Sequence, residues 1–403
     1  MSAELDRKIA DFVAYAYRHA PGVKRWLDAA EVKPEEIQGE ADLARVPVLT
    51  KDRMVELQAQ DPPFGGFLAV PLTQVTHLFF SPGPLYEPAG KETELIDTAE
   101  PLFRQAGFGP ESIALNSLSY HLVPAGLMID GVLQRVGCTV VPVGVGNADL
   151  QVKMMQDFGV TGYVGTPSWL ATLLKKAEEM EIPAAEMALK QVLLTAEPLS
   201  ASMRTMFVEE YGLQVTNAYA TAELGFLAYD QEGQMALRLL EGPLIQVVDR
   251  DTGQTVGPGD VGEVVVTNFN RTYPLIRFGT GDLAMNVDPA PGKSRQGERS
   301  IILVGRVGEA VKVRGMFVHP NQLAFALSRF PIAGYRAIVR RPELRDEFVL
   351  QVVPRPEAGE VSELAEEIRQ AVREVCRVRL DHLEFVDELP EDGPKIVDER
   401  RWD

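Results

Sequence analysis

The chain has 403 residues, 45% hydrophobic and 24% charged, which is enough for a large buried core in two or three domains. Its formal net charge of -18 at pH 7 argues against nucleic acid and anionic lipid as partners, because polyanions are repelled at long range. No apolar run reaches the length of a membrane span, and the acidic N-terminal residues are unlike a signal peptide. Two cysteines and five scattered histidines predict a reducing cytoplasmic location, without a disulfide framework or a histidine–cysteine metal cage.

The first 240 residues contain helices and then an alternation of strands and helices. We expect helices in the first sixty residues, with breaks at Pro21, Pro34 and Pro47. Further along, we expect strands at 112–116, 139–143, 162–166 and 191–195, and helices at 125–136, 150–158, 168–180 and 200–211. Short Val- and Leu-rich strands that alternate with helices favour a parallel sheet buried between two helix layers. Ligands bind such sheets at loops beyond the carboxyl ends of the strands.

After residue 240 the pattern changes to mainly antiparallel strands with Gly and Pro turns. These strands are expected at 245–249, 262–266, 273–278 and 300–304. From Gly305 onward we expect an α+β pattern with helices at 321–329 and 364–376 and with strands near residues 337, 349 and 384. The sequence therefore predicts an α/β protein with a large lobe, 1–304, of parallel-sheet layers plus a β-rich subdomain, and a small α+β lobe, 305–403.

The junction between the two predicted lobes carries the most distinctive motif. Glycines bracket an alternating Val-Lys-Val-Arg run in residues 305–320, which predicts a short strand between tight turns. Gly305-Arg306, followed by Arg314-Gly315 and then Val318-x-Pro320, resembles the domain junction of the adenylate-forming superfamily, in particular its phenylacetate–CoA ligase branch. The resemblance implies the adenylate-forming fold and an acid–thiol ligase that forms an acyl-adenylate and then an acyl-CoA. It also implies ATP or AMP, Mg²⁺ and coenzyme A as ligands, a small carboxylic acid as substrate, and a homodimer.

The predicted ribose site is Asp282, which follows Thr280-Gly281. A carboxylate can accept both ribose hydroxyl protons, and a glycine lets the backbone approach a ligand closely. An aspartate in a Gly-rich β-turn is the structural alternative. By resemblance, Arg306 lies near the ribose and phosphate, and a solvated arginine at a strand end is its alternative.

Two segments of the large lobe resemble the parts of the family that bind adenine and Mg²⁺. Ala196-Glu197-Pro198 corresponds to a segment that holds the adenine edge, although Glu197 could instead cap the next helix together with Ser200. Residues 217–223 resemble the Tyr-Gly-x-Ser/Thr-Glu motif. This implies nucleotide contacts by Asn217, Ala218, Tyr219 and Thr221, with Tyr219 stacked on adenine, and Mg²⁺ binding by Glu223. The alternative is a strand followed by a helix, with Glu223 in its first turn.

Two further sites follow from the same resemblance. Lys395, after Gly393-Pro394, matches the catalytic lysine that contacts the carboxylate and α-phosphate during adenylation, and a solvated lysine in an acidic tail is the alternative. Tyr120, with His121 and Val123, falls where the acid pocket is expected. Core packing at a strand–helix junction explains these three residues equally well.

The phosphate-binding segment departs from the family, which has a Ser/Thr/Gly run ending in Gly-Lys-Pro. This chain has Phe-Phe-Ser-Pro-Gly-Pro-Leu-Tyr-Glu-Pro at 79–88, so Pro82 and Pro84 remove backbone donors. Glu87 replaces a lysine, and at about 4 Å and an effective dielectric near 20 this exchanges an attraction of several kcal/mol for a repulsion. Gly308 takes the hinge position of the branch and Glu309 follows it. The alternative function is therefore a non-adenylating homologue that binds AMP, acyl-adenylate or acyl-CoA; a scaffold without nucleotide affinity is a third.

Overall fold

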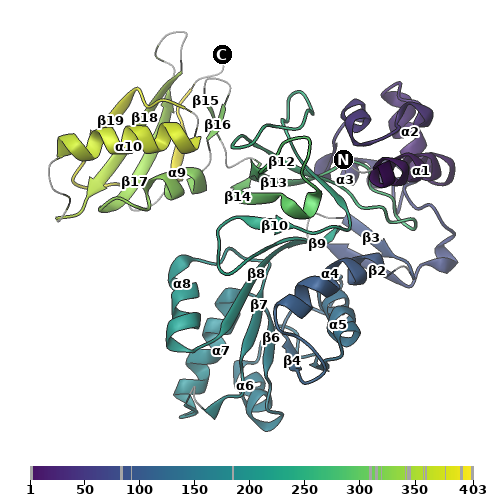
Figure 1. Cartoon of the computed structure of the whole chain (residues 1–403), viewed down its shortest axis with the longest axis horizontal. Coiled ribbons are helices and arrows are strands. Elements are labelled where there is room, and N and C mark those ends of the chain that lie inside the picture. Colours follow the sequence, from purple (N-terminus) through teal and green to yellow (C-terminus); the bar gives the residue numbers. More distant parts are fainter. Residues whose placement is uncertain are drawn as a thin grey trace. The chain divides into compact units, whose positions relative to one another are not determined.

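The computed structural model describes residues 3–81, 85–91, 93–183, 186–307, 311–313, 316–318, 320–340, 342, 346–356, 358, 361–376, 378–390 and 394–400. Several residues named above lie outside them: Pro82, Pro84, Gly308, Glu309, Arg314, Gly315 and Gly393. The chain divides into two compact units (Figure 1). The first consists of Met1–Gln246, Val265–Thr280 and Val287–Ile301, and the second of Val247–Val264, Gly281–Asn286 and Ile302–Asp403. The predicted division between 304 and 305 stays a prediction.

The N-terminal part of the first unit is helical, as predicted. It contains α1 (Ala3–His19), α2 (Pro21–Ala29), two 3-10 turns (Pro34–Glu36 and Glu40–Arg45) and α3 (Lys51–Gln60). Pro21 and Pro34 stand at the first position of their helices, where a missing N–H costs nothing. Thr50 caps α3 through its hydroxyl, which accepts a hydrogen bond from the Arg53 N–H at 3.2 Å. This cap fixes Lys51 as the first residue of the helix.

The centre of the first unit is a parallel sheet with the strand order β5-β4-β6-β7-β8, which confirms the predicted α/β class. The strands are β4 (Ile113–Asn116), β5 (Thr139–Val141), β6 (Gly162–Gly165), β7 (Gln191–Leu194) and β8 (Gln214–Thr221). The helices are α4 (Glu94–Gln105), α5 (Ala125–Val136), α6 (Ala148–Asp157), α7 (Pro167–Glu179) and α8 (Ala201–Thr205). The helix expected at 200–211 continues only as a π-helical turn, Met206–Glu210.

Both faces of this sheet are buried, because neighbouring residues of each strand enter different cores. Val164 packs with residues of α4 and α5 on one face, whereas Tyr163 packs with residues of α6 and α7 on the other. Ala114 and Leu115 of β4 divide between the two cores in the same way. Figure 1 shows α4 and α5 on one side of the strands and α7 and α8 on the other. This alternation explains why the strands are apolar throughout.

Further strands extend the sheet beyond β8. They are β9 (Gly225–Asp230), β10 (Leu237–Leu239), β11 (Leu244–Val248), β12 (Val261–Thr267), β13 (Phe278–Val287) and β14 (Ser300–Arg306). The pairs β8–β9, β9–β10 and β10–β14 are antiparallel. The short strand β1 (Leu49–Thr50) pairs in parallel with β13 at Phe278 and Gly279. A two-stranded sheet, β2 (His77–Ser81) and β3 (Leu85–Ala89), carries the described part of the predicted phosphate segment.

The strand expected at 273–278 is wrong, since β13 begins only at Phe278. Asparagine side chains bind the backbone of this segment instead. The Asn268 Oδ1 accepts from the Leu275 N–H at 3.1 Å, and the Asn270 Oδ1 accepts from the Tyr273 N–H at 2.8 Å. Such local side-chain bonds compete with a strand ladder.

Arg277 joins this segment to the N-terminal part of the first unit. The guanidinium is fully buried and donates to two backbone carbonyl oxygens, those of Leu43 at 2.8 Å and Val46 at 2.9 Å. The Arg277 carbonyl in turn accepts from the Leu49 N–H at 2.9 Å. Burial lowers the pKa of Arg277 to about 10. Arg277 therefore positions the segment that leads into β1 and α3.

The second unit contains the predicted α+β region. Its elements are β15 (Val311–Val313), β16 (Met316–Val318), α9 (Pro320–Leu327), β17 (Ile332–Arg340), β18 (Glu347–Pro354), α10 (Val361–Cys376), β19 (His382–Phe385) and β20 (Ile396–Asp398). Four strands form a mixed sheet with the order β19-β18-β17-β20. Apolar residues of α9 and α10 pack on this sheet around Val339, Phe348 and Ile368. Among the residues that the structure describes, no helix is both long and apolar enough to cross a membrane.

Candidate active site

The structure brings the two predicted ribose-side residues together within the second unit. The Arg306 Nε donates to the Asp282 Oδ1 at 2.9 Å. The Asp282 side chain is mostly buried, whereas Arg306 is exposed. Gly281 has a φ of 77°, a left-handed conformation that glycine adopts without strain. A carboxylate beside a guanidinium is a combination suited to a ribose diol next to a phosphate.

Glu263, which the sequence analysis missed, supports this turn from β12. Its Oε1 accepts from the Gly281 N–H at 3.1 Å, and its Oε2 lies 3.4 Å from the Arg250 Nε. Burial raises the pKa of Glu263, while these two contacts lower it. A glutamate between Gly262 and Val264 in an otherwise apolar strand is the signal that could have revealed it.

Ala196, Glu197 and Pro198 lie exposed at the carboxyl end of β7, where a parallel sheet binds ligands. Ala196 has a φ of 67°, which is rare for a residue with a side chain. The Glu197 carboxylate accepts from the Ser168 hydroxyl at 2.9 Å and from the Ser168 N–H at 3.3 Å, at the start of α7. Ser200 alone caps α8, accepting from the Met203 N–H at 3.2 Å. Glu197 therefore binds the first turn of α7 and does not cap α8 together with Ser200, and its adenine contact stays a prediction.

Asn217, Ala218, Tyr219 and Thr221 all belong to β8, and Ala218 and Tyr219 are buried. The Asn217 N–H donates to the Asp230 Oδ1 at 2.7 Å. A turn then leads from β8 into the antiparallel strand β9, with Gly225 at a φ of 70°. The expected helix after Thr221 is therefore wrong, and Glu223 lies in this turn.

Glu223 forms an ion pair that the sequence analysis missed. The Lys51 Nζ lies 2.7 Å from the Glu223 Oε1, and the exposed fractions of these side chains are 25% and 4%. The position of Lys51 directly after the helix cap Thr50 could have indicated this ion pair. A lysine directly after a helix cap faces the positive end of the helix dipole, which is unfavourable unless an anion lies nearby.

The polar atoms near Glu223 fit the Mg²⁺ that the family implies. The Glu223 Oε2 and the Thr221 Oγ1 are buried and have no hydrogen-bond partner among the described residues. Among the residues that the structure describes, no group of three His, Cys, Asp or Glu side chains could enclose a metal. Mg²⁺ is usually bound by one or two carboxylates together with substrate phosphates. Glu223 is therefore suited to a cation that ATP shares.

Glu87 lies on β3, and the structure buries it instead of exposing it to a phosphate. Only 8% of the residue is accessible. Burial and, to a smaller extent, the charge of Glu223 raise the pKa of the Glu87 carboxyl to about 7, against the opposing effects of the Ser81 hydroxyl and the charge of Lys51. Glu87, Glu223 and Lys51 therefore interact within one region of the first unit.

Helix α3 holds this region together. Lys51, Met54 and Gln58 share one helix face. The Gln58 Nε2 donates to the Tyr86 carbonyl oxygen at 2.8 Å and to the Tyr273 hydroxyl at 3.0 Å, and the Gln58 Oε1 accepts from the Tyr86 N–H at 2.9 Å. The side-chain amide therefore fixes β3 to α3 at the residue before Glu87.

Tyr120 follows β4 and binds a buried asparagine. The Asn116 Nδ2 donates to the Tyr120 hydroxyl at 2.8 Å and to the Gly126 carbonyl oxygen at 2.9 Å. Burial raises the pKa of Tyr120 to about 12. Val123 is half-buried, but His121 is exposed, so core packing does not describe His121. The acid-pocket role of all three residues stays a prediction.

Lys395 lies in the second unit, directly before β20. Its carbonyl oxygen accepts from the Ala337 N–H at 2.9 Å, and its Nζ lies 5.3 Å from the centroid of the Tyr335 ring. The side chain is exposed. The strand therefore fixes the backbone while the ammonium stays accessible, and its catalytic role stays a prediction.

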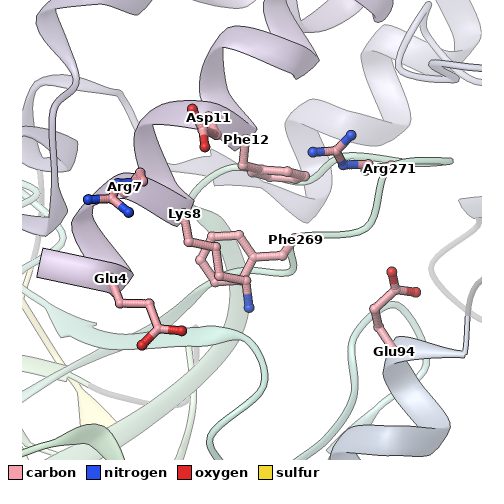
Figure 2. Close-up of a pocket in the computed structure, with 8 residues that line it drawn as sticks. All are labelled: Glu4, Arg7, Lys8, Asp11, Phe12, Glu94, Phe269 and Arg271. Atoms are coloured by element: carbon pink, nitrogen blue, oxygen red, sulfur yellow. The ribbon is translucent and has the colours of Figure 1, made fainter. Parts of the chain in front are cut away.

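A cavity of about 390 Å³ lies elsewhere in the first unit (Figure 2). It is lined by Glu4, Arg7, Lys8, Asp11, Phe12, Glu94, Phe269 and Arg271, and by none of the predicted site residues. Figure 2 shows the Lys8 side chain against the Phe269 ring, and the Lys8 Nζ is 4.0 Å from the ring centroid. This cavity is separate from the site built above.

Comparison with known proteins identifies the family. Residues 103–270 match the family model described as AMP-binding enzyme. A phenylacetate–CoA ligase of Thermus thermophilus is 32% identical over 391 residues, which are 94% of this chain and 85% of the relative. The chain belongs to the phenylacetate–CoA ligase family. The Escherichia coli phenylacetate–CoA ligase is 27% identical over 331 residues, covering 78% of this chain and 73% of that relative.

Solved structures confirm the adenylate-forming fold of this family member. An open conformation of 2-hydroxyisobutyryl-CoA ligase, in complex with 2-HIB-AMP and CoA, matches with a TM-score of 0.78 at 21% identity. The match covers 98% of this chain and 91% of the other. The apo MatB of Rhodopseudomonas palustris matches with a TM-score of 0.56 at 18% identity, covering 81% and 66% of the two chains.

Proposed function

We propose that this protein is an ATP-dependent carboxylic acid–CoA ligase. It converts an acid and ATP into an acyl-adenylate and pyrophosphate, and then lets the CoA thiol displace AMP to give an acyl-CoA. The 32% identity to a phenylacetate–CoA ligase across 94% of the chain carries this proposal. A carboxylate is a poor electrophile, so adenylation supplies the leaving group that thioester formation needs.

The described side chains support a role for each unit in nucleotide binding. In the second unit, Asp282 accepts hydrogen bonds from the ribose, and the paired Arg306 adds a positive charge beside it. In the first unit, Glu197 and Tyr219 bind the adenine, and Glu223 holds Mg²⁺ with Lys51 beside it. Mg²⁺, when bound, neutralises charge on the phosphates. Lys395 contacts the acid and the α-phosphate during adenylation.

The test is product formation by the purified protein with ATP, Mg²⁺ and CoA. Arylacetic acids come first in the acid panel because the similar curated proteins are phenylacetate–CoA ligases; other aryl acids and short aliphatic acids follow. Acid-dependent release of AMP and pyrophosphate, with formation of the acyl-CoA, is the expected result. Absence of AMP and pyrophosphate with every acid would contradict the proposal. A homodimer and a cytoplasmic location stay predictions, and light scattering after size-exclusion chromatography measures the former.

A non-adenylating homologue is the second candidate, and Glu87 is the observation that favours it. A buried carboxylate in the phosphate segment opposes polyphosphate binding when no cation neutralises it. This candidate predicts that calorimetry detects AMP binding but no binding of ATP with Mg²⁺. Binding of ATP with Mg²⁺ at micromolar affinity would exclude it.

A further inference from the structure

The charges of two buried carboxylates and one lysine act on one another in the first unit. Glu87 comes from β3, Glu223 from the β8–β9 turn, and Lys51 from the start of α3. Glu87 is 8% exposed, the Glu223 side chain is 4% exposed, and the Lys51 Nζ lies 2.7 Å from the Glu223 Oε1. When both carboxylates are ionised, the three groups carry a net charge of about -1, so one lysine does not balance them.

Each carboxylate has an oxygen that the described residues leave without a hydrogen bond. These atoms are the Glu87 Oε1 and the Glu223 Oε2, and the Thr221 Oγ1 is a third buried oxygen of the same kind. A buried carboxylate oxygen without a partner costs free energy unless a ligand satisfies it. Carboxylate and hydroxyl oxygens are ligands that hard divalent cations prefer.

The position of Glu87 is fixed by its neighbours. Gln58 binds both backbone polar groups of Tyr86, at 2.8 and 2.9 Å, and so fixes the residue directly before Glu87. Tyr86 is exposed and Glu87 is buried, as the alternation of side chains along a strand requires. The same helix face of α3 carries Lys51. The helix therefore holds the lysine and the strand that carries Glu87 in one arrangement.

We propose that Glu87 is a second carboxylate ligand of the divalent cation that Glu223 holds. The proposal rests on the proposed ligase function, and it gives a reason for a glutamate in place of the family's lysine. With a divalent cation bound, Lys51 and the two carboxylates have a net charge of about +1, which attracts a polyphosphate. The phosphate segment then acts on ATP through the metal, without a lysine of its own.

Mn²⁺ binding followed by electron paramagnetic resonance tests this role without any turnover. The native chain, Glu87→Gln and Glu111→Gln are titrated with Mn²⁺ at saturating concentrations of a non-hydrolysable ATP analogue. Glu111→Gln is the matched control, because it removes the same charge at an exposed position before β4. We expect Glu87→Gln to weaken Mn²⁺ binding at least about tenfold and Glu111→Gln to leave it unchanged.

The direction of the change separates a ligand from a repulsive charge. If Glu87 only repels phosphate, Glu87→Gln binds the Mn²⁺–nucleotide complex more tightly than the native chain, and the proposal is overturned. Unchanged affinity overturns it as well. Glu87→Asp keeps the charge and is expected to bind Mn²⁺ more tightly than Glu87→Gln, and equal affinity contradicts the proposal. If the native chain itself binds no Mn²⁺ with the nucleotide, the ligase function fails too. If the native chain binds Mn²⁺ but Glu87→Gln binds it equally well or more tightly, only the role of Glu87 is overturned.

Discussion

Glu87→Gln should change how the stability of this protein depends on pH. Burial, reinforced by the charge of Glu223, raises the pKa of Glu87 from its ordinary value of 4.5 to about 7. Between these two values the native chain binds more protons than the unfolded chain, so the free energy of unfolding falls as the pH rises. Since each pKa unit corresponds to about 1.4 kcal/mol, the ionised carboxylate costs the native state about 3 kcal/mol at pH 8.

Glutamine has nearly the shape of glutamate and does not ionise, so the variant should lose this dependence. Urea unfolding is followed by circular dichroism at pH 5 and pH 8, with EDTA present to exclude divalent cations. We expect Glu87→Gln to be more stable than the native chain by about 3 kcal/mol at pH 8 and to show most of that gain disappear at pH 5. Glu111→Gln, which removes an exposed charge, should show no such change. An equal effect of Glu87→Gln at both pH values would refute the argument, because it would mean that Glu87 titrates normally.

Three further substitutions test other parts of the structure. Arg277→Met should lower the free energy of unfolding by about 3 kcal/mol or more, because two buried carbonyl oxygens lose their donors; an unchanged urea midpoint would contradict this. Gly126→Ala places a Cβ 2.6 Å from the Ser119 carbonyl oxygen and 2.8 Å from the Tyr120 ring, and it should lower stability by about 1–3 kcal/mol and raise the KM for the acid. Gly131→Ala is the control, because its new Cβ meets only the end of the Ile96 side chain. Lys395→Ala should abolish adenylate formation yet leave thioester formation from supplied acyl-adenylate largely intact, and equal loss of both half-reactions would exclude the assigned role.

The parallel-sheet core could be predicted because its signal is local. Each strand is a short apolar run between helices, and both faces are buried, so neither periodicity nor register has to be known. The strand expected at 273–278 is wrong because strand propensity does not account for side chains that bind the backbone. Asn268 and Asn270 satisfy the backbone of that segment with their side chains, and this requires a specific bend of the chain.

The candidate site could be predicted only where a motif carries it. Separate motifs predict Asp282 and Arg306, and the structure brings the Arg306 Nε to 2.9 Å from the Asp282 Oδ1. The sequence does not predict the role of Lys51, because its partner, Glu223, is distant in the chain and only the fold brings the two residues together. The sequence predicts Glu87 as a charge that faces phosphate, because it does not show that Glu87 is buried near the charge of Lys51.

The side-chain amide of Gln58 also covers part of the unpaired edge of β3. The two-stranded sheet of β2 and β3 leaves the outer side of β3 without a neighbouring strand in the described sheet order, and Gln58 occupies both backbone groups of Tyr86 there. Leu78, Phe80 and Tyr86 are exposed on the same hairpin. An open strand edge beside apolar side chains is a template for intermolecular pairing and aggregation. Gln58 therefore removes the Tyr86 backbone groups from intermolecular pairing while it positions Glu87.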